Sequence, residues 1–158
     1  MREIKFRVWD KLLKEFNVLS LHDITEDDYW YDGKSEMWSV FYDGTHEQEK
    51  FIIEQYTGLK DIHGVEICEG DRIKYHDDLS SGKDYNLGII KFGEYYQDGS
   101  GGEYGGSKCL GFYVEMTKRY VYDGWKNKLE EWEIEEYLKQ NSLLCIKDIE
   151  VIGNIHES

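Results

Sequence analysis

The 158-residue sequence contains no proline and only three cysteines, Cys68, Cys109 and Cys145. Without proline, the chain has no proline-rich docking motif and no long rigid linker. Three widely spaced cysteines do not form the disulfide framework of a small secreted domain. No apolar run is long enough to span a membrane, and the opening residues MREIKFRVWD lack the apolar core of a signal peptide. These absences predict a cytoplasmic protein.

Positive charge is scarce as well, since 19 Lys and Arg against 33 Asp and Glu give a formal net charge of −14. A protein that binds nucleic acid mainly through phosphates needs a basic surface, and so does one that adheres to anionic membranes. The charge balance therefore disfavours both partners. With so many carboxylates, the sequence does not identify a catalytic acid–base pair. Such a pair is defined by the distance between two carboxyl groups in a cleft of the folded protein.

The chain is rich in aromatic side chains and glycine, with 13 Tyr, 6 Phe, 5 Trp and 16 Gly. This mixture favours short strands and tight turns over a helical bundle. Ile4, Phe6 and Val8 alternate with basic residues, which is typical of a half-buried strand and predicts a hairpin over residues 4–22. Further strands are expected at 51–56, 72–75, 86–93, 109–116 and 145–155, with a glycine-rich hairpin tip at 97–107.

Residues 23–49 carry nine acidic residues against Lys34 alone, a net charge of −8. One interpretation is a contact surface for a basic partner. The other is the solvated face of a hairpin with a strand at 37–42, whose aromatic residues contribute to the core. The aromatic residues interleaved here are Tyr29, Trp30, Tyr31, Trp38, Phe41 and Tyr42.

The C-terminal part has a different pattern, with Trp125, Leu129 and Trp132 at helical spacing among good helix formers. This predicts a helix of two to three turns near residues 130–140, before the last strand. The expected fold is therefore mainly β (β-rich α+β), an N-terminal hairpin region followed by a small SH3-like barrel. We expect an N-terminal β-rich region at 1–56 and the barrel at 57–158, or one integrated domain over 1–158.

No catalytic or metal-binding set is evident, so we expect neither enzymatic activity nor a cofactor. The acidic neighbour Glu69 does not favour a reactive thiolate at Cys68, which is better explained as a small, semi-buried strand residue. The stretch DGSGG is nearest to a nucleophile elbow but lacks its Gly-x-Ser-x-Gly spacing. Three short groups of residues could each supply part of a metal site, but the sequence identifies no further ligand for any of them. They are His22-Asp23, His46-Glu47 and His76-Asp77-Asp78.

The most patterned stretch is QYTGLKDIHGVEICEGDRIKY, with Gly58, Gly64 and Gly70 six residues apart. This spacing matches neither the phosphate loop GxxxxGK[ST] nor GxGxxG. It fits a series of turns that leads into a strand at Arg72. Gly70 would supply a positive φ, and the Asp71 carboxylate would accept hydrogen bonds from the turn's own amides.

Three stretches, MREIKFRVWD, QYTGLKDIHGVEICEGDRIKY and IEVIGNIHE, resemble the YopX family of bacteriophage and prophage proteins in this order and at comparable spacing. They lie at both ends and the centre, so the resemblance spans the chain. It implies a β-rich fold with a small SH3-like barrel and self-association, and it brings no catalytic residues. The sequence departs from the family pattern at Ile62-His63, where a Lys-Asn type turn is common, and at Cys68, where an aromatic is frequent.

The primary functional hypothesis is a non-enzymatic phage or prophage protein, a homo-oligomeric interaction or assembly module with a host protein as a further partner. One alternative is an acidic decoy for the basic site of a nucleic-acid-processing host protein, based on the acidity at 23–49 and 130–136. Another is a small-barrel nucleic-acid binder, which the overall acidity disfavours. Its N-terminal basic residues would be Arg2, Lys5, Arg7, Lys11 and Lys14.

Overall fold

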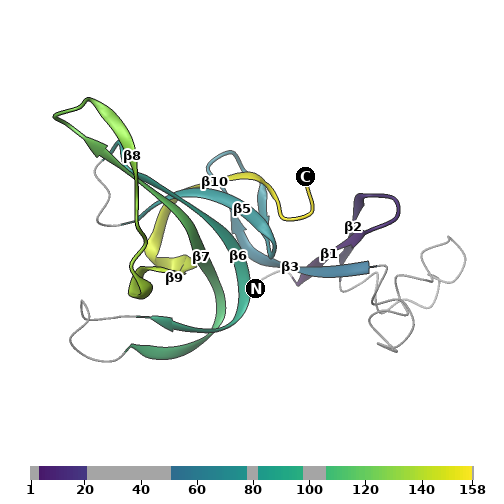
Figure 1. Ribbon diagram of the computed structural model, residues 1–158. Coiled ribbons are helices and arrows are strands. Elements are labelled where there is room, and N and C mark those ends of the chain that lie inside the picture. Colours follow the sequence, from purple (N-terminus) through teal and green to yellow (C-terminus); the bar gives the residue numbers. More distant parts are fainter. Residues whose placement is uncertain (1–3, 21–50, 78–81, 98–105, 158) are drawn as a thin grey trace, which may run out of the picture. The chain divides into compact units, whose positions relative to one another are not determined.

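The computed structural model describes residues 4–20, 51–77, 82–97 and 106–157 (Figure 1). The acidic segment 23–49, its expected strand at 37–42 and the tip of the expected 97–107 loop lie outside these residues. The chain divides into two compact units, Met1–Gly58 and Leu59–Ser158. The described elements are almost all strands, so the prediction of a mainly β fold is confirmed.

The first unit contains the predicted N-terminal hairpin. Strands β1 (Lys5–Asp10) and β2 (Glu15–Ser20) pair antiparallel, and β3 (Phe51–Lys60) pairs with the other side of β1. The Asp10 carboxylate closes the turn by accepting hydrogen bonds from the amides of Leu12 and Leu13, at 2.8 and 3.0 Å. Val8 is fully buried, as the alternation of β1 predicts. β3 continues into the second unit, where β4 (Glu66–Cys68) is its neighbour.

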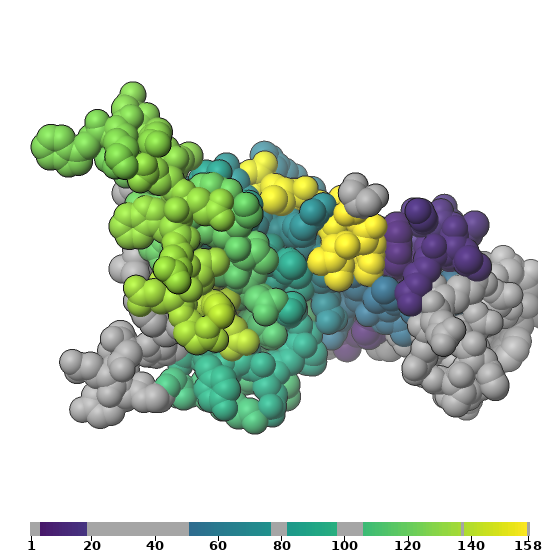
Figure 2. All heavy atoms as spheres, viewed as in Figure 1, coloured from purple at the N-terminus to yellow at the C-terminus, as the bar shows by residue number. Residues whose placement is uncertain are grey.

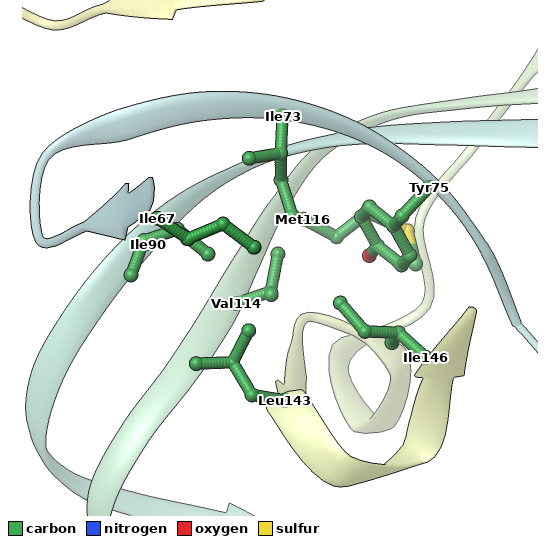
Figure 3. Packing of buried hydrophobic residues seen from close by; sticks show 8 residues of the cluster. All are labelled: Ile67, Ile73, Tyr75, Ile90, Val114, Met116, Leu143 and Ile146. Atoms are coloured by element: carbon green, nitrogen blue, oxygen red, sulfur yellow. The ribbon is translucent and has the colours of Figure 1, made fainter. Parts of the chain in front are cut away.

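The second unit is built on one antiparallel sheet in the order β10-β5-β6-β7-β8, with β9 also pairing with β7. The long β6–β7 hairpin coils strongly, so the sheet curls into a half-barrel (Figure 1). Its concave side holds a core of eight buried residues (Figure 3): Ile67, Ile73, Tyr75, Ile90, Val114, Met116, Leu143 and Ile146. The strands are β5 (Asp71–Asp77), β6 (Tyr85–Gln97), β7 (Ser107–Asp123), β8 (Lys128–Trp132), β9 (Gln140–Ser142) and β10 (Ile146–Asn154).

The coiling of this hairpin has a local cause. Gly93 and Gly111 lie directly opposite each other, with φ of 153° and 156°. L-residues rarely adopt this backbone conformation, so glycine at both positions lets the two strands bend together. The rings of Tyr95 and Tyr113, which flank the glycine pair in the register, stack at a centroid distance of 5.1 Å. The stacked rings supply the side-chain contact that the glycines lack.

The prediction of a helix near residues 130–140 is wrong. Residues 128–132 form β8 and pair with 119–123 of β7, and only Glu136–Leu138 forms a single 3-10 turn, η2. The Asp123 carboxylate accepts hydrogen bonds from the amides of Trp125 and Lys126, which reverses the chain. Each residue of β8 then gains a cross-strand partner. A helix this short has little stability of its own, so the hairpin forms instead.

Two of the three turns predicted from the glycine spacing are confirmed, at Gly64 and Gly70, whose φ values are 83° and 80°. The turn predicted at Gly58 is wrong, because Gly58 lies within β3, where its φ of 87° is a local irregularity of the strand. Gly64→Ala is expected to lower the free energy of unfolding by about 1 kcal/mol. No heavy atom of the described residues lies within 4 Å of an added Cβ at Gly64, so the cost comes from the backbone angle. Urea unfolding checks this against Gly82→Ala, where no described heavy atom lies within 4 Å of an added Cβ and φ is outside the +20° to +160° range. Equal losses for the two variants would contradict the assignment.

Candidate interaction surface

The buried Asp61 side chain, in the stretch that contains Gly58, Gly64 and Gly70, joins the turn after β3 to β10. Its carboxylate accepts hydrogen bonds from the amides of His63 and Val65, both at 2.8 Å, and of Val151 at 3.1 Å. Burial opposes ionisation, but these three amides outweigh it and hold the pKa of Asp61 below its usual value. The Ile62 amide also donates to the carbonyl of Ile149 at 2.9 Å. The turn after β3 therefore covers the outer edge of β10.

Asp71 has a similar structural role at the next turn. As predicted, its carboxylate accepts a hydrogen bond from a turn amide, that of Cys68, at 2.8 Å. Its other oxygen lies 3.3 Å from Asn154 Nδ2, and the Ile155 amide donates to the Gly70 carbonyl at 3.0 Å. The polar groups of the two turns thus bind the C-terminal strand, and their positions do not form a phosphate loop.

The other residues considered for chemistry are dispersed. Cys68 is buried at the end of β4, and His76 and Asp77 lie at the end of β5. Asp78, His22-Asp23 and His46-Glu47 lie outside the described residues. Across the described ranges, no three His, Cys, Asp or Glu side chains gather as a metal site would require. In the same ranges, no helix has the length and apolarity needed to cross a membrane.

Two of the basic residues considered for nucleic acid are engaged within the first unit. Arg7 Nε lies 2.6 Å from Glu54 Oε2, and its guanidinium lies 4.3 Å from the centre of the Phe16 ring. Lys5 Nζ lies 5.5 Å from the centre of the Tyr56 ring. Lys11 and Lys14 are exposed in the β1–β2 turn, and Arg2 lies outside the described residues. Two of these five residues therefore contact β2 and β3 within the first unit.

The acidic residues at 130–136, considered for a decoy, are partly neutralised. Glu130 Oε1 lies 2.8 Å from Lys126 Nζ and 3.3 Å from Lys128 Nζ. Hydrogen bonds from these two lysines hold the pKa of Glu130 below its usual value. Glu131 lies 3.3 Å from Lys118, and Glu136 forms an ion pair with Lys139. Three of these carboxylates thus have a lysine beside them, which weakens their resemblance to a row of phosphates.

The end of the β7–β8 hairpin, residues 119–132, exposes three large apolar side chains, and we call it the arm. Trp125 at its turn is 100% exposed, and Trp132 and Leu129 are 56% and 42% exposed. Figure 2 shows the arm standing away from the rest of this unit. The helical spacing of these residues predicts that they lie together on the apolar face of a helix, whereas here they are exposed. The sequence signal for the hairpin is Asp123-Gly124, a dipeptide that favours a turn.

Aromatic and cationic side chains brace the base of the arm. Tyr85 of β6 and Tyr120 of β7 are cross-strand partners whose rings stack at a centroid distance of 4.8 Å. Lys74 Nζ lies 4.8 Å from the centre of the Tyr85 ring, and Lys83 Nζ lies 3.9 Å from that of Tyr122. Such contacts hold a hairpin in one position and reduce the entropy lost when it binds.

The family profile described as YopX protein matches residues 5–158. The chain belongs to the YopX family. The comparison with curated proteins gives no match. Among solved structures, this YopX-family chain is similar to one titled "Crystal structure of protein EF1440 from Enterococcus faecalis". The two are 24% identical over 98% of this chain and 94% of the other, with a TM-score of 0.40.

In this YopX-family chain the two ends of the curled sheet differ. At one end, the turn at Asp61 and Ile62 occupies backbone groups of β10. At the other end, β8 is the last strand in the sheet order, and no described strand pairs with its outer side. An open edge presents backbone N–H and C=O groups that can pair with another chain. The open edge and the exposed tryptophans lie on the same element, the arm.

Proposed function

We propose that this chain is a non-enzymatic interaction module of a bacteriophage or prophage, which self-associates in the bacterial cytoplasm. The observation that supports this most is Trp125, a wholly exposed tryptophan at the turn of a braced hairpin. Tryptophan is enriched among the few residues that supply most of the binding free energy at interfaces. A monomer in water gains nothing from exposing this side chain, whereas a partner surface would bury it.

Two finer features belong to the same proposal. We assign the curled sheet of the second unit as the SH3-like barrel that the family resemblance implies, because its strands run antiparallel around one core. A host protein is the second kind of partner, and affinity capture from the host cell with intact and Trp125→Ala chains tests for it. A captured protein that is lost with the variant would support a host partner that binds the arm.

Light scattering after size-exclusion chromatography tests the self-association. The unmodified chain is expected to exceed the monomer mass at micromolar concentrations, and Trp125→Ala is expected to weaken association about ten-fold or more. Leu144→Ala is the matched control, because Leu144 is 87% exposed on the 3-10 helix Leu143–Cys145, outside the arm. A monomer at every micromolar concentration would overturn the proposal.

A further inference from the structure

The open edge of β8 carries charged residues in an ordered arrangement. The register with β7 places Lys128, Glu130 and Trp132 on one face of the strand and Leu129 and Glu131 on the other. Lysines or glutamates on an edge strand normally discourage pairing with another chain. Whether they do so depends on which residues a second strand would place opposite them.

Along this strand the basic residues come first and the acidic residues follow. Lys126 and Lys128 precede Leu129, and Glu130 and Glu131 follow it. An antiparallel copy of the same strand has the reverse order. The basic half of each strand therefore meets the acidic half of the other, and opposite charges on facing residues stabilise a strand pair.

Symmetry restricts the register of such a pair. In an antiparallel pair, directly opposed residues have their side chains on the same face of the sheet. The two-fold axis that relates the two strands is perpendicular to the sheet, so a side chain and its copy also lie on the same face. Since neighbouring residues of a strand lie on opposite faces, the axis must pass through a residue and not between two residues. An axis at Lys128 would oppose two lysines, and an axis at Glu130 would oppose two glutamates. Only an axis at Leu129 places Lys128 opposite the partner's Glu130, and it does so twice.

We propose that two copies of this chain pair antiparallel through the outer edges of β8, centred on Leu129. This rests on the proposed self-association and specifies its partner and register. The same register places Lys126 opposite the partner's Trp132, which permits a cation–π contact on either side of the axis. Leu129, 42% exposed in the single chain, is buried against the partner's Leu129.

The other edge of the sheet explains why the pairing would stop at two copies. The Val151 amide donates to Asp61, and the Ile149 carbonyl accepts from the Ile62 amide, so these groups of β10 are not available to a third strand. Pairing of two β8 edges is isologous and uses the open edge of each copy. The expected product is a closed two-fold dimer rather than a fibre.

Charge reversal tests the register. Lys128→Glu and Glu130→Lys each place two like-charged pairs across the axis, so each variant alone is expected to dimerise about ten-fold more weakly. An equimolar mixture restores both ion pairs and is expected to give a heterodimer by native mass spectrometry. Lys11→Glu is the control, a charge reversal at an exposed turn of the first unit. If the mixture stays as weak as the single variants, the register is overturned.

Cross-linking tests the axis independently. In a Cys109→Ser, Cys145→Ser background, where Cys68 is buried, Leu129→Cys is expected to form a disulfide-linked dimer on mild oxidation. Glu131→Cys is expected not to, since Glu131 would oppose the partner's Asn127. If the unmodified chain dimerises but the two cysteine variants do not differ in this way, the β8 pairing is overturned and self-association still stands. A monomeric unmodified chain would overturn both.

Discussion

Gly88→Ala is expected to lower the free energy of unfolding by about 3 kcal/mol. Gly88 lies at a register shift in the pairing of β6 with β7. A Cβ at this position would lie 2.9 Å from the carbonyl oxygen of Glu115 and closer still to Cγ1 of Val114. Val114 is fully buried and the carbonyl is backbone, so neither can move without displacing the strand.

Urea unfolding followed by circular dichroism measures this effect. Gly124→Ala is the matched control, because Gly124 lies in the β7–β8 turn and no heavy atom in the described part of the chain is within 4 Å of an added Cβ. The control is expected to change stability by less than about 0.5 kcal/mol. A Gly88→Ala midpoint as high as that of the control would show that the two strands do not approach this closely.

Asp61→Ala is the second change expected to have a large effect, about 2–4 kcal/mol of unfolding free energy. The substitution removes one carboxylate that accepts three backbone hydrogen bonds, and it leaves those amides without their acceptor. It also removes one of the two hydrogen bonds that join the turn to β10. Asp61→Asn retains one oxygen in the same place, so it is expected to lose less.

The lowered pKa of Asp61 gives this prediction a pH signature. A carboxyl whose pKa is lower in the folded than in the unfolded chain stabilises the fold above its unfolded pKa, here about 3.8. That stabilisation is lost as the pH falls from there through the folded pKa. The difference in unfolding free energy between the unmodified chain and Asp61→Asn is therefore expected to shrink on acidification from pH 7. A difference that stays constant would contradict the role of the ionised carboxylate.

Local signals made most of the fold predictable. Alternation marked β1 because the strand has one buried face, and the glycine spacing marked the turns at Gly64 and Gly70 because each needs a positive φ. At Gly58 the same signal predicted a turn where the chain continues as β3. The hydrogen bond from the Cys68 amide to Asp71 followed from the same local chemistry. The partner of Asp61 on β10, Val151, could not be predicted, because the two residues lie 90 positions apart and meet only in the folded unit.

The arm was not predictable from periodicity alone. Trp125, Leu129 and Trp132 fit one face of a helix, whereas the structure places them at a turn and on opposite faces of β8. Pairing with β7 decides the outcome, and that is a tertiary interaction. The sequence shows lysines before Leu129 and glutamates after it. This order bears on pairing with a second chain only once β8 is known to be an edge strand.

Hydrogen–deuterium exchange at increasing protein concentration tests the central claim, that the open edge of β8 is an interface between copies of this chain. Amides of residues 128–132 are expected to exchange more slowly as dimers form, and Lys128→Glu is expected to shift this dependence to about ten-fold higher protein concentration. Amides of β10, whose edge is covered within the chain, serve as the internal reference. Exchange in β8 that does not change with concentration, while the chain is dimeric by light scattering, would contradict the account.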